Sequence, residues 1–226
     1  MPFALVALLA FQKPAYTTRA DHDPDGIGKF YMGREIAQFM SHEAADWLDR
    51  PTREQEEAPS RLIAALKLKP GMTIVDVGAG SGALSFPMAK KVSPGGQVYA
   101  EDIQPEMLAL VRKRAQKAGV KNVVPLLGTT TDPKIAPGSA DLMILVDVYH
   151  EFDQPYEMVA SMVRGLKKGG RLVFVEYRGE DPEVPIKELH KMTLAQVRKE
   201  MVPFPLTYGG SNETLPRQHI ITFTKR

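Results

Sequence analysis

The chain has 226 residues, enough for one domain with a full hydrophobic core and a small N-terminal addition. Its 29 Lys and Arg residues against 27 Asp and Glu residues leave a net charge of +2, so no overall field indicates nucleic acid or an acidic surface as a partner. Because cysteine is absent, disulfides, thiolate metal sites and cysteine nucleophiles are excluded.

The first 29 residues read as an apolar segment and a polar linker. The run FALVALLAF at 3–11 has the length of a signal-peptide core, yet no basic residue precedes it and no clean cleavage site follows. It is too short to span a bilayer as a helix. Export with residues 1–20 as a signal, and a cytoplasmic protein whose apolar helix packs on the domain, both stay open. The linker at 13–29 has no core of its own, so we expect the folded domain to occupy 30–226.

Residues 30–67 are predicted to form a helical extension in front of the main domain. Their pattern predicts one helix over 30–50, ended by Pro51, and a second from a capping box at Thr52 and Gln55 toward Leu66, which Pro59 restarts or kinks. The apolar positions at helical spacing in the first helix are Ile36, Phe39, Met40, Ala44, Trp47 and Leu48.

After the turn at 69–71, short apolar runs alternate with helical segments, which is typical of βαβ units and a parallel sheet. The predicted strands lie near 73–78, 97–102, 123–127, 141–147 and 171–176, and the predicted helices near 82–91, 105–118, 155–166 and 186–201. The tail segments FPLTYGG and HIITFTK have no helix between them. They predict an antiparallel pair that closes the sheet.

The loop DVGAGSGA at 76–83 follows the first of these strands. Its glycines allow a tight turn and a close approach of a ligand to the helix N-terminus. Alone it also satisfies the dinucleotide fingerprint, so it is ambiguous. Asp102, 20 residues beyond Gly82, stands where an acid accepts hydrogen bonds from ribose. Asp76 would repel a pyrophosphate about 4 Å away by roughly 4 kcal/mol, so it favours a cationic ligand.

Three motifs in order, VDVGAGSG, VYAEDIQPEML and LKKGGRLVFVE, resemble those of class I S-adenosylmethionine-dependent methyltransferases over about residues 58–226. The resemblance implies an α/β fold, a doubly wound, Rossmann-like, mostly parallel sheet of seven strands with a C-terminal antiparallel hairpin. It also implies S-adenosylmethionine as the cofactor. The residues assigned to it are Asp76 near its amino-acid end, Gly78, Ala79, Gly80 and Gly82 in the loop beneath it, Asp102 at the ribose, Ile103 beside the adenine, and Thr129 or Asp132 at the adenine amine.

The stretch VDVYHEF at 146–152 ends the predicted fourth strand, beside the glycine loop, and should edge the cofactor's methyl group at Asp147. His150 is the candidate general base, and Glu151 either orients it or caps the next helix. Glu176 ends the neighbouring strand on the same rim. The alternative is that this stretch only closes the core. A metal-dependent transferase could use Asp147, His150 and Glu176 as hard ligands, but no ligand spacing requires a metal. No metal site is therefore assigned, and metal assistance stays open as the lesser alternative. His190 is expected on the 186–201 helix, in the core or at its edge.

The predicted function is methyl transfer to a small-molecule acceptor, selected by the helical extension that carries Trp47, His42 and Arg53. Nucleic acid is disfavoured because the paired-proline motif of base-amine methyltransferases is absent, and the basic run at 112–117 reads as a solvated helix face. Two rivals remain, a nucleotide-dependent oxidoreductase and a non-catalytic cofactor-binding protein. The oligomeric state is not predicted.

Overall fold

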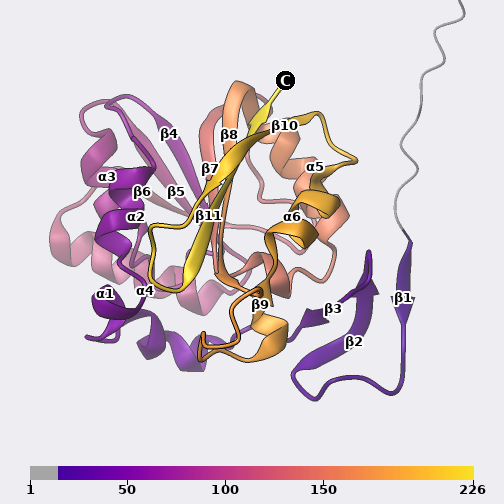
Figure 1. The fold of residues 1–226 in the computed structure, drawn as a ribbon. Helices are drawn as coiled ribbons and strands as arrows, with labels where there is room; N and C mark the ends of the chain where they lie inside the picture. Colours follow the sequence, from indigo (N-terminus) through magenta and orange to yellow (C-terminus); the bar gives the residue numbers. More distant parts are fainter. Residues whose placement is uncertain (1–14) are drawn as a thin grey trace, which may run out of the picture.

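The structure, a computed structural model, describes residues 15–226, so the apolar run at 3–11 and both hypotheses about it lie outside the described residues. A large sheet with strand order β10-β11-β8-β7-β4-β5-β6 forms the centre of the molecule (Figure 1). Its strands are β4 (Thr73–Val77), β5 (Gln97–Asp102), β6 (Val123–Leu127), β7 (Ala140–Val146), β8 (Leu166–Arg178), β10 (Leu206–Asn212) and β11 (Gln218–Lys225).

Strands β4 to β8 run parallel, whereas β11 is antiparallel to both β8 and β10. The predicted fold class, with its C-terminal hairpin, is therefore confirmed. Within this large sheet, one strand was not predicted. It is the two-residue β9 (Lys191–Met192), which pairs with the end of β8.

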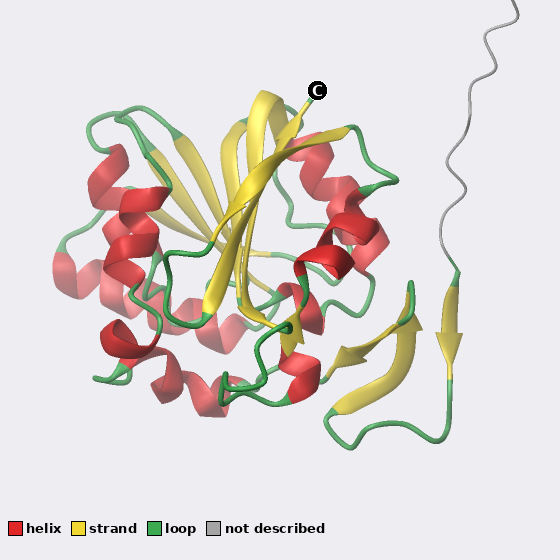
Figure 2. Ribbon diagram, viewed as in Figure 1, coloured by secondary structure: helices red, strands yellow, loops and turns green. Residues whose placement is uncertain are grey.

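Helices cover both faces of this sheet (Figure 2), and each face has its own hydrophobic cluster. On one face Ile74 packs among residues of α2 (Pro59–Ala65), α3 (Ser85–Val92) and α4 (Pro105–Ala118). On the other face Val75 packs among residues of α5 (Pro155–Gly165) and α6 (Leu194–Met201). Because successive strand residues point to opposite faces, strands covered on both sides are apolar throughout, which explains the continuous runs in the sequence.

The N-terminal part of the chain differs from the prediction. Strands β1 (Tyr16–Thr18), β2 (Gly26–Tyr31) and β3 (Arg34–Ala37) form a small antiparallel sheet, seen at the lower right of Figure 1. The helix expected over 30–50 is wrong except at η1 (His42–Asp49), which is a 3-10 helix. The reason is a hairpin turn at Met32 and Gly33, whose φ angles of 49° and 100° suit a two-residue connection between twisted strands.

Of two further helical predictions, the restart at Pro59 is confirmed and the helix over 186–201 is wrong at its start. The segment after Thr52 is split into α1 (Arg53–Glu56) and α2, because Ala58 has a φ of 52° and Pro59 starts a new helix, as the proline predicted. The helix expected over 186–201 begins only at Leu194, where the Thr193 hydroxyl accepts a hydrogen bond from the Gln196 amide. The preceding residues form η3 (Glu188–His190) and β9 instead.

Candidate active site

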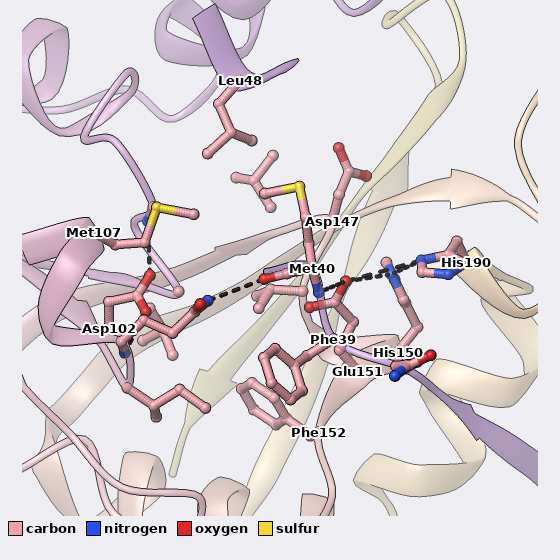
Figure 3. Close-up of a pocket in the computed structure, with 18 of the residues that line it drawn as sticks. Phe39, Met40, Leu48, Asp102, Met107, Asp147, His150, Glu151, Phe152 and His190 are labelled. Atoms are coloured by element: carbon pink, nitrogen blue, oxygen red, sulfur yellow. Dashed lines mark hydrogen bonds and ion pairs between the residues drawn. The ribbon is translucent and has the colours of Figure 1, made fainter. Parts of the chain in front are cut away.

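A cavity of about 790 Å³ opens at the carboxyl ends of the parallel strands, under the segment that links β3 to α1. In Figure 3, Met40 and Leu48 of this segment lie across the cavity from Asp102 and Asp147, which belong to the sheet side. Carboxyl ends of strands at the switch between β4 and β7 are where doubly wound sheets bind ligands. The sequence-predicted residues in the cavity wall are Gly78, Gly80, Asp102, Ile103, Thr129, Asp147, His150 and Glu151.

The glycine loop lies against the segments on either side of it. Gly78 has a φ of 67°, and a Cβ there would come within 2.5 Å of Val148, which follows the fourth parallel strand. Gly80 is approached as closely by Leu48 of η1. Both positions combine a left-handed backbone with a neighbour that leaves no room for a side chain, so only glycine fits.

Two adjacent carboxylates hold this loop from β5. The Asp102 carboxylate accepts hydrogen bonds from the backbone amides of Gly80 (2.9 Å) and Gln104 (2.8 Å). The Glu101 carboxylate accepts one from the Gly78 amide (3.3 Å), and its other oxygen is buried without a hydrogen-bond partner among residues 15–226. Burial, together with the Asp102 charge, raises the pKa of Glu101 to about 8. Sequence reasoning missed Glu101, although it stands beside Asp102 in the motif.

Three predicted cofactor residues are not in the cavity wall. Asp76 is buried behind the loop and accepts a hydrogen bond from the Ser85 hydroxyl (2.5 Å), and burial raises its pKa to about 6. Ala79 and Gly82 shape the turn itself, with the Gly82 amide donating to the Ala79 carbonyl (2.9 Å). The assignment of these three residues to the cofactor stays a prediction.

Asp147 follows the end of β7 with a left-handed φ of 53°. One of its carboxylate oxygens accepts a hydrogen bond from the Gln218 side chain (2.6 Å), while the other is buried without a partner in the described part of the chain. Burial, together with the charge of Glu57, raises its pKa well above the usual range. An unpaired buried carboxylate oxygen at a ligand cavity is suited to a ligand that brings a hydrogen-bond donor or a positive charge.

Glu57 belongs to an ionic group that the sequence did not reveal. Its carboxylate contacts the guanidinium groups of Arg50 and Arg53 and accepts a hydrogen bond from the Tyr177 hydroxyl (2.6 Å). All four residues line the cavity. Of the residues expected to cover the pocket, Arg53 and Trp47 do so, whereas His42 is outside its wall.

Figure 3 shows a cluster of polar side chains, His150 and Glu151 after β7 and His190 of η3, and Glu176 of β8 contacts His150. His150 is buried, and its Nδ1 lies 2.6 Å from Glu176 Oε2. Its Nε2 lies 3.1 Å from Nδ1 of His190 and 3.8 Å from Oε1 of Glu151. The predicted site residues His150, Glu151 and Glu176 are therefore together. His190 joins them from the end of η3, not from the α-helix that was expected over 186–201.

The surroundings keep both imidazoles neutral. Burial lowers the pKa of His150 to about 4 and that of His190 to about 4. The Glu176 carboxylate also accepts a hydrogen bond from the Tyr149 amide through Oε1 (2.9 Å), and burial raises its pKa to about 8. When the shared hydrogen is on Nδ1 of the neutral imidazole, the lone pair of His150 Nε2 is directed toward His190 and the cavity.

The family model of the methyltransferase domain matches residues 68–213, from the end of the preceding helix to the C-terminal hairpin. The chain belongs to the class I S-adenosylmethionine-dependent methyltransferases. Its cofactor is therefore S-adenosylmethionine, as the three sequence motifs implied. This membership favours methyl transfer over the rival oxidoreductase hypothesis, which rested on the glycine loop alone.

Relatives of this methyltransferase act at different acceptor atoms. It is 31% identical to nocamycin O-methyltransferase of Saccharothrix syringae, over 70% of this chain and 54% of that protein. It is 29% identical to a ubiquinone/menaquinone biosynthesis C-methyltransferase of Cupriavidus metallidurans, over 51% of this chain and 47% of that protein. The chain thus spans about half the length of these relatives, and their substrates do not identify its own.

The fold of the methyltransferase has close counterparts among solved structures. A S-adenosylmethionine-dependent methyltransferase from Aquifex aeolicus superposes with a TM-score of 0.78 at 22% identity, covering 83% of this chain and all (100%) of the other. Identity this low supports the fold only. Within residues 15–226, no helix is long and apolar enough to cross a membrane.

Proposed function

We propose that this methyltransferase transfers the methyl group of S-adenosylmethionine to a hydroxyl oxygen of a small, largely apolar molecule. The observation that carries the proposal is the buried pair of His150 and Glu176. The other imidazole nitrogen, Nε2, lies at the cavity beside the end of β7, 3.1 Å from Nδ1 of His190. A neutral histidine oriented by a carboxylate is suited to take a proton from an acceptor as it is methylated.

The cavity residues suit the cofactor at each of its parts. The glycine loop at Gly78 and Gly80 offers a backbone that a ligand can approach closely, and the unpaired oxygen of Asp147 suits an ammonium group. Asp102 is placed for the ribose hydroxyls. Ile103 and Thr129 would then flank the adenine, as the motifs implied.

The cavity wall near the histidine cluster includes several apolar side chains among its polar ones. These apolar side chains include Phe39, Met40, Phe152 and Ile186, of which Phe39 is half-exposed. Side chains of this kind hold a hydrophobic or aromatic molecule by area burial, while a few polar groups set its orientation. The relative named as an O-methyltransferase, the nocamycin enzyme, agrees with an oxygen acceptor.

Bound S-adenosylmethionine would supply a methyl group on its sulfonium sulfur. The acceptor oxygen would bond to the methyl carbon in line with the sulfur, which leaves as S-adenosylhomocysteine. The wall residues hold the acceptor in position for this displacement, and orientation of this kind can supply on the order of 7 to 11 kcal/mol. Nε2 of His150 takes the proton from the hydroxyl of the molecule being methylated, and Glu176 stabilises the imidazolium that forms. General-base assistance of this type contributes about 10² to 10⁴ in rate.

The test is an acceptor screen with the full chain and S-adenosylmethionine. Phenols and alcohols of small apolar molecules, with matched amines and thiols, would be compared by release of S-adenosylhomocysteine and by product mass. We expect release with hydroxyl compounds. Release only with amines or thiols would refute the oxygen acceptor, and cofactor binding without release from any acceptor would support the non-catalytic alternative.

A further inference from the structure

The cluster beside the acceptor wall contains three potential metal ligands. Nε2 of His150, Nδ1 of His190 and Oε1 of Glu151 all lie within 4.8 Å of one another and are the only such group of three found among residues 15–226. All three residues line the same cavity as the glycine loop. We infer that they form a binding site for a divalent transition-metal ion whose open side faces the acceptor.

The distances between the ligand atoms fit such an ion. His150 Nε2 and His190 Nδ1 are 3.1 Å apart, and each lies 3.8 Å from Glu151 Oε1. The centre of a triangle with these sides is roughly 2.1 Å from each corner, within the bond lengths of about 2.0 to 2.2 Å that Zn²⁺ makes with imidazole nitrogen and carboxylate oxygen. An ion therefore needs no rearrangement of the backbone to enter.

Neighbouring groups hold the ligands as a metal site requires. His150 donates its other ring nitrogen to Glu176, which fixes the imidazole and leaves Nε2 free to coordinate. Glu176 is held in turn by the Tyr149 amide. The Glu151 carboxylate is positioned by the Met40 amide (3.2 Å). Histidine ligands backed by a hydrogen-bonded carboxylate are the usual arrangement in protein metal centres.

Acidic groups at the cluster can balance the charge of a cation. Glu151 belongs to the cluster and Glu176 backs His150, while Arg34 and Lys187, whose charges also act on the two histidines, are each paired with an acid. Arg34 is paired with the buried Glu200, and Lys187 is paired with Asp25. Two imidazoles and one carboxylate suit ions of the Zn²⁺, Fe²⁺ or Co²⁺ type better than Mg²⁺ or Ca²⁺, which take oxygen ligands.

The role of the ion rests on the proposed function. A cation bound to Nε2 of His150 would occupy the lone pair that otherwise takes the proton, so His150 would no longer act as the base. The cation would instead lower the pKa of the hydroxyl of the methyl acceptor. The acceptor class narrows accordingly to molecules whose hydroxyl oxygen can coordinate a metal, such as phenols with a second oxygen on the neighbouring carbon.

The test measures metal binding without any acceptor. Chelator-treated full-length protein would be titrated with Co²⁺ and followed by visible absorption, and with Zn²⁺ by calorimetry. We expect one ion per chain. His190→Ala and Glu151→Gln should weaken binding by at least 10-fold, Glu176→Gln by about 10- to 100-fold, and His42→Ala, a histidine outside the cavity wall, should leave it unchanged.

Each variant would also be titrated with S-adenosylmethionine, so that a loss of metal binding in a folded protein is distinguished from unfolding. No stoichiometric binding by the unaltered chain, or binding that His190→Ala leaves intact, would overturn the inference. Because the titration needs no acceptor, metal binding without methyl transfer would refute only the proposed function. Methyl transfer by a chain that binds no metal would refute only the inference.

Discussion

Several carboxylates around the cavity are held in surroundings that oppose their ionisation. Glu101 has one oxygen without a partner in the described chain, and Asp147 has another. Each is desolvated and lies near other acids, so its pKa is raised. Perturbed acids of this kind cluster at functional sites, where an incoming ligand supplies the missing positive charge or donor. The cavity therefore favours a cationic cofactor before any acceptor arrives.

Glu101 gives a prediction about stability and pH. Its pKa is about 8 in the folded chain and near 4.3 when unfolded, so unfolding releases its proton between these values. The stability that protonated Glu101 contributes to the folded chain is fully present below about pH 4 and is lost as pH rises through about 8. Glu101→Gln should remove a few kcal/mol of this pH dependence, at about 1.4 kcal/mol per pKa unit. Urea unfolding at pH 5, 7 and 9 measures it. If the free energy of unfolding changed equally with pH in the unaltered chain and in Glu101→Gln, the raised pKa of Glu101 would be contradicted.

His150 gives a second prediction at this scale. His150→Ala should lower turnover of a true acceptor by about 10² to 10⁴ while sparing S-adenosylmethionine binding, because the imidazole serves the acceptor and not the cofactor. Turnover by S-adenosylhomocysteine release and affinity by calorimetry separate the two effects. The control is His42→Ala, which should change neither quantity. If His150→Ala left turnover unchanged, the histidine would only form part of the wall.

Among the elements, the segment between β3 and α1 covers the cavity and is tied to it at several points. The Gln104 side chain donates to the Met40 carbonyl (3.0 Å) and accepts from the His42 amide (2.8 Å), which fastens the segment to the loop after β5. The Met40 amide donates to Glu151 across the opening. The cover is thus attached both to the cofactor side and to the acceptor side.

A buried ion pair attaches β3 to α6. The Arg34 guanidinium contacts both carboxylate oxygens of Glu200 (2.7 and 3.2 Å) and donates to the His150 carbonyl (3.1 Å). Arg34→Ala should lower the free energy of unfolding by about 3 to 5 kcal/mol, because Glu200 is left buried without a counterion and keeps only its hydrogen bonds from Tyr149 and Gln196. Chemical denaturation measures the change.

The matched control is the double variant Arg34→Ala with Glu200→Gln. Because the buried charge is then gone as well, much of the lost stability should return. A double variant as unstable as Arg34→Ala would show that lost packing, and not the unpaired carboxylate, accounts for the effect.

In the whole molecule, the cavity lies at the carboxyl ends of the parallel strands, in a sheet whose two faces are packed by separate hydrophobic clusters. The scaffold is therefore rigid beneath the site, and the loops and the N-terminal cover supply its specificity. A ligand that binds only the folded chain must add to the stability of this whole unit.

That linkage gives a prediction for the cofactor. S-Adenosylmethionine at 100 times its Kd should stabilise the protein by about 2.7 kcal/mol, seen as a rise in Tm. Asp102→Ala should abolish most of the rise, because it removes the carboxylate that holds the glycine loop at Gly80. Asp46→Ala, an exposed aspartate outside the cavity wall, is the control and should keep it. A full rise in Asp102→Ala would exclude that residue from the cofactor site.

Regular elements and motifs near each other in the chain could be predicted from the sequence. The five parallel strands, the C-terminal hairpin and the turn at the glycine loop were correct because apolar periodicity and turn residues are local signals. The cofactor roles of the loop glycines and Asp102 stay predictions. The N-terminal sheet was missed because its apolar residues also fit a helical spacing, and only the turn at Met32 and Gly33 decides between the two. The i,i+4 spacing of Arg53 and Glu57 was a local signal that went unused, whereas the contact of Glu57 with Tyr177 of β8 was missed because no local pattern connects the two.

By itself, the sequence determined the family, the cofactor and the order of the elements, since these depend on short motifs that each fold within one βα unit. Only the tertiary structure decided the composition of the acceptor site. His190 reaches His150, 40 residues earlier, because β9 pairs with the end of β8 next to Glu176. Contacts of this range depend on how the chain packs, and a histidine in a segment with helical spacing carries no sign of them.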